Sequence, residues 1–505
     1  MTSLRLKHVK LSFLVFVDSR GKTLNPSAGL VNRLWRMCAV LRKDGVTYQQ
    51  YVTELTYLLF LKMIQETGLS EASLPAGYGW REIVDAPTGK KLKLYRATLD
   101  KLGNLNSNVA RSIIDIFTKA ETVIRDEKNL VSILEQLDSI KWFSKDRDSF
   151  GDIYEGLLEK NAEETKRGAG QYFTPRVVID VIVALMKPSV GEVVQDPAAG
   201  TGGFLVAAQQ HARAFSGGDC VVTGIENVRD TYRLLRMNLY LHNSNSDSVF
   251  LGDTLSDDHL KLSKSDLILT NPPFGPSGGR PSRKDLIVTS TVSSFALPFV
   301  EHCINALLPG GRAAIVVPDS ILYEDGRGRA LRKLLLDTCN LHTILRLPSG
   351  IFYAQGVKTN VLFFQRGYDS ENNTKSVWVY DLRTDMPAFG KTVPLSKHHF
   401  DSFAEFYGDN ANGKDRSDNE RAKNDLRARN FTREEISNRE DNLDITWLRE
   451  DDSRDEDSII NPEDILAAIV GHLSTALTEI TALAEDLDLS TDLTRQRSSI
   501  RTEKI

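Results

Sequence analysis

Asp196-Pro197-Ala198-Ala199-Gly200-Thr201-Gly202-Gly203-Phe204 is the stretch that decides the fold of this 505-residue chain. It follows the apolar run Val193-Val194 and leads into a second apolar run, so it predicts a strand, a tight glycine turn and a helix N-terminus. Glycine lets a ligand approach bare backbone, and the free N–H groups at the start of a helix favour a negatively charged group. Such turns hold several classes of ligand, and some are purely structural, so the stretch alone leaves its role open.

Two further motifs accompany the glycine turn. Ser265 to Thr270 forms a buried-strand pattern that runs directly into Asn271-Pro272-Pro273-Phe274, and Gly170-Gln171-Tyr172-Phe173-Thr174-Pro175 lies upstream. With these three motifs in this order, the chain resembles the modification (M) subunit of type I restriction–modification systems over about residues 30–364. The resemblance implies an adenine-specific DNA methyltransferase that uses S-adenosylmethionine, acts on N6 of adenine and protects host DNA from cleavage. The fold that it implies is a doubly wound, Rossmann-like α/β sheet.

The residue types in Asn271-Pro272-Pro273-Phe274 suit methyl transfer to an exocyclic amine. The side-chain oxygen of Asn271 and the carbonyl oxygen of Pro272 are two acceptors for the amine N–H groups, and consecutive prolines stiffen the backbone. Phe274 offers a face for a base taken out of the helix. The methyl group sits on a sulfonium, so neither a covalent intermediate nor a metal is expected. We therefore predict Asn271, Pro272, Pro273 and Phe274 as the catalytic residues.

Acids at strand ends are the expected ligands of the cofactor. Val221 to Glu226 predicts a strand whose terminal acid accepts from the ribose hydroxyls, with a solvated strand-end carboxylate as the alternative. Val249 to Asp253 predicts another, with Asp253 accepting from the cofactor's adenine. Thr174-Pro175 predicts a helix cap with proline at the first helical position, and in the resembled family this stretch lies over the methionine part. The predicted cofactor-binding residues are Gln171, Tyr172, Phe173, Thr174, Pro175, Arg176, Asp196, Gly200, Thr201, Gly202, Gly203, Glu226 and Asp253.

Composition gives information about the binding partners of the chain and its cellular compartment. Formal net charge is −5, from 63 basic and 68 acidic residues, whereas a chain that holds DNA alone usually carries a basic face. A partner is therefore expected to supply much of the grip on DNA. The four cysteines are far apart and, like the nine histidines, show no metal-ligand spacing, which fits a reducing cytoplasm. No run approaches the ~18 apolar residues of a membrane span.

Helical periodicity and charge divide the chain. Leu30, Leu34, Met37 and Leu41 predict an amphipathic helix, and similar patterns cover residues 47–66, 106–124, 130–140 and 152–158. We predict an N-terminal extension at 1–28, a helical domain at 29–160, a methyltransferase domain at 161–407 that ends in a hairpin expected from the family, and a charged linker at 408–457. The loop at residues 275–284 is basic and is expected to be flexible, either bearing on the DNA backbone or staying solvated.

The C-terminal segment at 458–505 predicts a docking helix. Asn461-Pro462-Glu463 has the form of a helix start. Apolar residues then recur at alternating spacings of three and four, as in a coiled-coil seam: Leu466, Ile469, Leu473, Ala476, Ile480, Leu483 and Leu487. The alternatives are packing on the chain's own catalytic domain and docking on a partner. The resemblance implies a specificity (S) subunit, two M per S, and a restriction (R) subunit in the full complex.

Two other functions fit parts of the sequence. A protein glutamine methyltransferase uses an Asn-Pro-Pro motif with the same amide geometry, but Phe274, the stretch at 171–175 and the long C-terminal tail favour DNA. A noncatalytic scaffold would keep the fold without the activity, and the presence of Asp196, Glu226 and Asn271 argues against it. No recognition domain of ~100 residues is visible, so the recognised DNA sequence stays open.

Overall fold

The computed structural model describes residues 26–67, 74–105, 111–140, 147–164, 174–245, 247–352, 357–384, 386–387, 389, 393–418 and 425–448. These residues form two compact units, one from residues 26–164 and 199–252 and the other from 174–198 and 253–448. Each unit is described by itself. Across the described ranges, no helix is long and apolar enough to cross a membrane.

The first unit is mainly helical. Its elements are α1 (Pro26–Arg42), α2 (Tyr48–Thr67), α3 (Trp80–Asp85), α4 (Lys91–Gly103), α5 (Arg111–Phe117), α6 (Glu127–Asp138), α7 (Arg147–Glu164), α9 (Gly203–Ser216), β2 (Val221–Glu226), α10 (Arg229–Leu241) and β3 (Val249–Leu251). The predicted stripe Leu30, Leu34, Met37 and Leu41 is buried, which confirms the first helix. The helix predicted at 106–124 ends earlier, at Phe117, because residues 118–124 form a turn and irregular backbone.

Buried arginines join α10 to the preceding helices. Arg233 donates to the carbonyls of Ile116 and Thr118 at 2.7 and 3.0 Å, and Arg236 pairs with Asp115 at 3.2 Å. The segment β2–α10–β3 therefore belongs to the same compact unit as the N-terminal helices. The boundary predicted near residue 160 assigns β2–α10–β3 and the N-terminal helices to different domains, whereas they share one compact unit. Polar ties of this kind between distant residues have no signature in apolar periodicity.

The second unit contains seven strands that pair side by side, with helices packed around them. Its elements are α8 (Arg176–Met186), β1 (Val193–Asp196), η2 (Asp257–Lys261), β4 (Ser265–Thr270), α11 (Ala296–Ala306), β5 (Leu307–Pro318), α12 (Ser320–Tyr323), α13 (Arg327–Thr338), β6 (Cys339–Arg346), β7 (Thr359–Arg366), β8 (Ser376–Asp381), η3 (Lys397–Phe400), α14 (Asp401–Tyr407), η4 (Lys414–Asp418), β9 (Ala428–Thr432) and α16 (Arg433–Ser437). The strand order is β1-β4-β5-β7-β6-β8-β9.

Strand direction gathers polar strand ends at one edge of this sheet. β1, β4 and β5 are mutually parallel, while β7 runs antiparallel to both β5 and β6. β6 therefore shares the direction of β5, and β8 is parallel to β6. The carboxyl ends of β1, β4, β5, β6 and β8 thus lie along a common edge, and the antiparallel pair β6–β7 is the predicted late hairpin.

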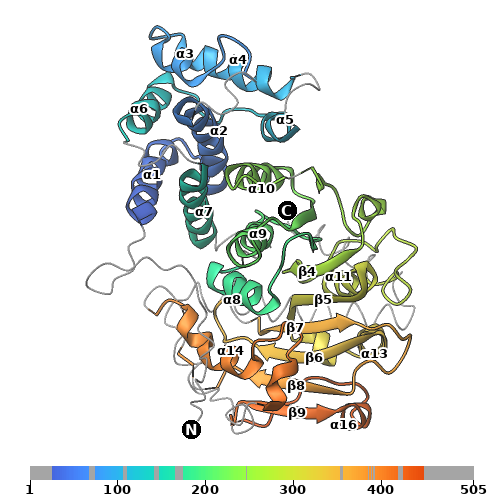
Figure 1. Ribbon diagram of the computed structural model, residues 1–505. Coiled ribbons are helices and arrows are strands. Elements are labelled where there is room, and N and C mark those ends of the chain that lie inside the picture. Colours follow the sequence, from blue (N-terminus) through green and yellow to red (C-terminus); the bar gives the residue numbers. More distant parts are fainter. Residues whose placement is uncertain are drawn as a thin grey trace, which may run out of the picture. The chain divides into compact units, whose positions relative to one another are not determined.

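Side chains of β7 alternate between two apolar layers. Leu362 and Phe364 belong to the core with α11 and α13, whereas the ring of Phe363 packs against Phe403 and Tyr407 of α14 at 6.0 and 5.2 Å between centroids. Figure 1 shows this layered arrangement around β5 to β8. Because both faces are covered, the strand reads as an unbroken apolar run.

The prediction of a charged linker at 408–457 is wrong for its described part. Residues 428–432 form β9, which pairs antiparallel with β8, and α16 follows directly. Phe431, Leu443 and Ile445 are buried in the sheet's core. Edge strands commonly carry charged side chains that discourage pairing with another chain, so the composition of β9 looks like that of a linker. The predicted docking helix lies outside the described residues.

Candidate active site

The glycine turn in the first unit is tied to the end of β2. Ala199 donates its N–H to the carbonyl of Ile225 at 2.9 Å, and Gly200 donates its N–H to Oε2 of Glu226 at 3.0 Å. Gly200 and Gly202 have φ of +54° and +86°, in the left-handed region that residues other than glycine rarely adopt. A Cβ at Gly200 would meet no described atom within 4 Å, so backbone conformation and open space, not packing, account for this glycine.

Glu226 is a half-buried acid held by backbone. Its Oε1 accepts from the N–H of Val228 at 2.8 Å, in addition to the bond from Gly200. Burial raises the pKa of the Glu226 carboxyl to about 7, although its backbone donors oppose the rise. A carboxylate has about four acceptor sites, so it can still accept hydroxyl groups from a ligand.

Val228 is an exposed apolar residue that sequence reasoning did not single out. The residue is 45% exposed and lies two residues beyond Glu226. An exposed valine beside a strand-end acid offers a surface against which a flat ring can pack. An apolar residue shortly after the acid of β2 was the available signal. Thr201 and Gly203 complete the turn, and the carbonyl of Thr201 accepts from Asn238 at 3.0 Å.

Asp196 ends β1 in the second unit and is 2% exposed. Its Oδ1 accepts from the hydroxyl of Thr270 at 2.7 Å and from the N–H of Ala198 at 3.1 Å. Thr270 is the last residue of β4, so this carboxylate links the end of β1 to the residue that precedes Asn271. The predicted acid and the predicted catalytic strand are therefore connected at the sheet edge.

Asn271 follows β4 and is 9% exposed. Its side-chain nitrogen Nδ2 donates to the hydroxyl of Thr174 at 2.9 Å. Its oxygen Oδ1 is buried and has no hydrogen-bond partner among the described residues. Buried polar oxygens are nearly always paired in proteins, so an acceptor in this state is suited to a ligand's N–H group. Pro272 is buried, and Pro273 and Phe274 are half-buried.

The predicted cap at Thr174 is wrong by one residue. Helix α8 begins at Arg176, and Pro175 occupies the capping position without a side-chain hydrogen bond. The hydroxyl of Thr174 meets Asn271 instead, which is a contact between residues 97 positions apart. Arg176 donates from Nε to Asp180 at 2.8 Å. Gln171, Tyr172 and Phe173 lie outside the described residues.

Asp253 lies in a turn and not at a strand end. β3 stops at Leu251, so the strand predicted to reach Asp253 is two residues too long. The Oδ1 atom of Asp253 accepts from the N–H of Leu255 at 2.9 Å, and its own N–H donates to Asp258 at 3.0 Å. Both bonds close the turn and fix the half-buried carboxylate.

The loop that follows Phe274, residues 275–284, is fixed by hydrogen bonds, and only some of its basic side chains are exposed. Arg283 is 3% exposed and donates to the carbonyl of Thr254 at 3.0 Å and to Asp285 at 2.9 Å. Residues Pro276 and Ser294 form a bridge across its base. The prediction of a flexible basic loop is therefore wrong for Arg283, whose charge is neutralised internally, while Arg280 and Lys284 are exposed.

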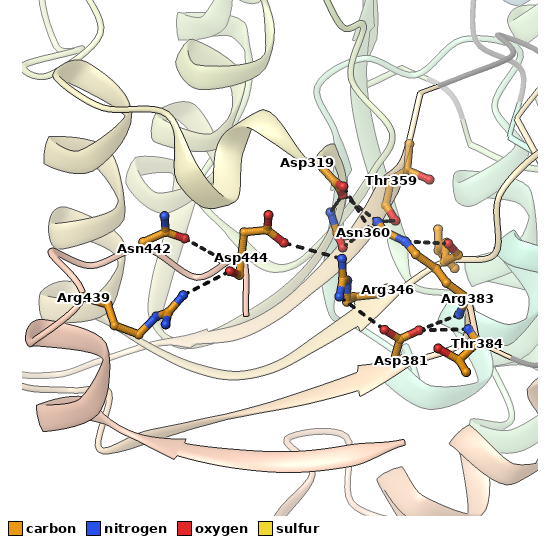
Figure 2. Close-up of polar contacts among 11 residues, drawn as sticks. Asp319, Arg346, Thr359, Asn360, Asp381, Arg383, Thr384, Arg439, Asn442 and Asp444 are labelled. Carbon is orange, nitrogen blue, oxygen red and sulfur yellow. Dashed lines mark hydrogen bonds and ion pairs between the residues drawn. The ribbon is translucent and has the colours of Figure 1, made fainter. Parts of the chain in front are cut away.

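A buried polar network braces the same sheet edge beyond β4. Figure 2 shows Arg383 with both η nitrogens on the carboxylate of Asp319, at 3.1 and 2.6 Å. Arg346 donates to Asp381 at 3.3 Å and lies 3.5 Å from Asp444. These charges tie the ends of β5, β6 and β8 together. Because the network is paired internally, it reads as a structural brace.

The described cysteines are unsuited to nucleophilic catalysis. All four are buried thiols. Burial raises the pKa of Cys38 to about 11 and also raises the pKa values of Cys303 and Cys339. For these three cysteines the thiolate form needed for attack is therefore disfavoured.

The sequence of this chain is similar to those of known DNA methylases. The family model of the N-6 DNA methylases matches residues 145–457. The type I restriction enzyme EcoKI methylase subunit of Escherichia coli K12 is 42% identical over 93% of this chain and 97% of its own length.

Solved structures extend the likeness to three dimensions. The crystal structure of the EcoKI M protein is 37% identical, covers 94% of this chain and 100% of its own, and superposes with a TM-score of 0.50. A structure from work on complex assembly and conformational transition of a type I restriction–modification system is 25% identical, covers 91% and 98%, and has a TM-score of 0.69. The doubly wound, Rossmann-like α/β fold of these structures is the predicted fold class.

Proposed function

This chain belongs to the N-6 DNA methylase family, among the methylase subunits of type I restriction enzymes, and from that membership we propose how its side chains act on DNA. It is an adenine-specific DNA methyltransferase that methylates the exocyclic N6 amino group. The alternative of a glutamine methyltransferase has no support in this family membership.

The unpartnered oxygen of Asn271 carries the proposal. We assign Oδ1 of Asn271 as one acceptor for the N6 amino group and the carbonyl oxygen of Pro272 as the other. Two acceptors draw the nitrogen toward a tetrahedral geometry, so its lone pair leaves the base ring and becomes nucleophilic. The side chain lies in a buried position, where a hydrogen bond is stronger than in water. Phe274 stacks the extruded adenine.

S-adenosylmethionine supplies an activated methyl group on its sulfonium. The residues proposed to hold it are Asp196, Gly200 to Gly203, Glu226 and Asp253, together with 171–176, and Val228 is added to them. The carboxylate of Glu226 can accept hydrogen bonds from the ribose hydroxyls. The open space at Gly200 allows a ligand to lie close to the backbone. Direct transfer then depends on alignment, which contributes a large share of the rate in enzymes.

Partners are proposed to provide the DNA sequence recognition. The net charge of −5 is low for a chain that grips DNA alone. We propose that the chain acts on DNA in the cytoplasm in complex with a specificity subunit, with two methylase subunits per specificity subunit. A restriction subunit joins in the full complex, and the segment at 458–505 is the proposed docking helix.

The test uses the full chain in complex with its specificity subunit. Asn271→Ala is expected to bind S-adenosylmethionine by calorimetry but to lose methyl transfer, read by sequencing N6-methyladenine in DNA. The matched control is Asn104→Ala, which removes the same group from the exposed residue that follows α4. If Asn271→Ala keeps more than about a tenth of the rate, the assignment of Asn271 is wrong.

A further inference from the structure

The amide of Asn271 has two ends of nearly equal size, and only one of them can serve the reaction. Its oxygen accepts the N–H groups of adenine, whereas its amino end would face another amino group. Packing alone distinguishes the two ends poorly because they differ only in hydrogen-bonding capacity. In this structure the amino end is occupied by Thr174 at 2.9 Å, and the oxygen end is left without a described partner.

We propose that Thr174 is a positioning residue that holds the Asn271 amide with its oxygen toward the target base. The inference rests on the proposed role of Asn271 and deepens it. The hydroxyl oxygen of Thr174 accepts from Nδ2, so the productive rotamer is stabilised before the base arrives. Pre-organised acceptors need no rearrangement during the reaction, which is where their catalytic advantage lies.

The backbone around Thr174 is suited to this task. Thr174 precedes Pro175, and a residue before proline is restricted to extended conformations. The carbonyl of Pro175 accepts from Val178 and Ile179 at 2.9 and 3.2 Å, which anchors the first turn of α8. Thr174 is itself 9% exposed. Since its hydroxyl caps no helix, the group is available to Asn271, and its own proton remains available for a second acceptor such as the cofactor.

Thr174→Val and Thr174→Ser test the proposal in the complex with the specificity subunit. Valine keeps the shape and removes the hydroxyl, so the single-turnover methylation rate is expected to fall about tenfold, the effect of one lost hydrogen bond. Serine keeps the hydroxyl and is expected to stay within about threefold of the wild-type rate. Thr98→Val is the matched control, because it removes a buried hydroxyl that bonds to Leu94 at 3.0 Å in the other unit.

A binding measurement without cofactor separates orientation from catalysis. The complex is offered duplexes carrying adenine or 2-aminopurine at the target position, and 2-aminopurine has no amino group on C6. The unmodified chain is expected to bind the adenine duplex more tightly than the 2-aminopurine duplex. In Thr174→Val this ratio of affinities is expected to fall by about the same factor as the methylation rate. Thr174→Ser should restore it.

Several outcomes would overturn the proposal. The proposal is wrong if Thr174→Val has the same rate and the same base preference as the unmodified chain. It is also wrong if Thr174→Ser is as impaired as Thr174→Val. A weaker affinity for S-adenosylmethionine with a normal rate at saturation would make Thr174 a cofactor contact only. Thermal unfolding of each variant checks the fold, and Thr174→Ala replaces the valine variant if that one fails to fold. An active Asn271→Ala variant would instead reject the role of Asn271 itself.

Discussion

The hydroxyl of Thr270 donates to Oδ1 of Asp196 at 2.7 Å, and both residues are buried. Asp196 begins the glycine motif, and Thr270 immediately precedes Asn271. One hydrogen bond therefore connects the residue proposed to act in cofactor binding with the strand that presents the base-binding amide.

Thr270→Val is expected to lower both the stability of the fold and the affinity for S-adenosylmethionine moderately. Removing one partner of a buried hydrogen bond costs about 1–3 kcal/mol of stability. We expect a lower thermal unfolding midpoint and a several-fold weaker affinity for S-adenosylmethionine by calorimetry. Thr270→Ser keeps the hydroxyl and should be close to the unmodified chain in both measurements. A valine variant with unchanged affinity would show that the link between the strands is only structural.

Two of the strands that carry the candidate site were predictable from the sequence, whereas the contacts between strands were not. Val221 to Glu226 and Ser265 to Thr270 match β2 and β4, because buried strands that end in a polar residue leave a clear pattern. The bond from Asn271 to Thr174 and the burial of Arg283 depend on residues far apart in sequence, which local patterns do not encode.

The pKa of Glu226 predicts a pH-dependent cofactor affinity. If the ionised carboxylate accepts the ribose hydroxyls, affinity rises with pH through about 7, by up to ~tenfold between pH 6 and 8. Calorimetric titrations at these pH values measure the change. Glu226→Gln is expected to bind more weakly at pH 8 and to show a much flatter profile. A profile that is the same for both proteins would exclude Glu226 as its source.

Folding stability should respond to Glu226 in the opposite sense. Its pKa in the folded state is raised above the ordinary value of 4.5, so its contribution to stability is present below about pH 4.5 and is lost as pH rises through about 7. The free protein is therefore expected to lose stability relative to Glu226→Gln between pH 5 and 8. Denaturant unfolding at each pH, without cofactor, provides the comparison.

Phe274 should contribute to base binding in proportion to its ring. Phe274→Ala is expected to weaken binding of the target base by about 1–3 kcal/mol, the range for stacking of a base on an aromatic side chain. Phe274→Trp keeps an aromatic face and should be milder. Fluorescence of 2-aminopurine at the target position reports the extruded base. The reverse order of effects would assign Phe274 to core packing.

The brace at Arg383 predicts a stability effect separate from catalysis. Arg383→Met would leave the carboxylate of Asp319 without its bidentate partner, although Asn360 still donates to it at 2.7 Å. Breaking a buried pair costs about 3–5 kcal/mol, and the low end applies because the Asp319 side chain is 19% exposed. Denaturant unfolding measures this loss, with the exposed Arg125→Met expected to change stability by less than about 0.5 kcal/mol.

The C-terminal segment gives a prediction about assembly that rests on its sequence. Its apolar residues alternate at spacings of three and four over residues 466–487, which is the pattern of a helix that packs against another helix along a narrow seam. A helix with such a seam buries it either on its own chain or on a partner. The acidic net charge and the lack of a visible recognition domain favour a partner that reads DNA.

Deleting residues 460–505 is therefore expected to leave S-adenosylmethionine binding intact while preventing co-purification with the specificity subunit and abolishing sequence-specific methylation. Replacing Leu473 and Ile480 together with Asp should do the same without truncation, because two charges in an apolar seam lose hydration that the interface does not replace. Thr475 and Thr478 fall between the seam positions in the sequence, so replacing both with Asp adds the same charge outside the seam and should not disturb assembly. If the truncated and seam variants both assemble normally, the docking surface lies elsewhere on the chain.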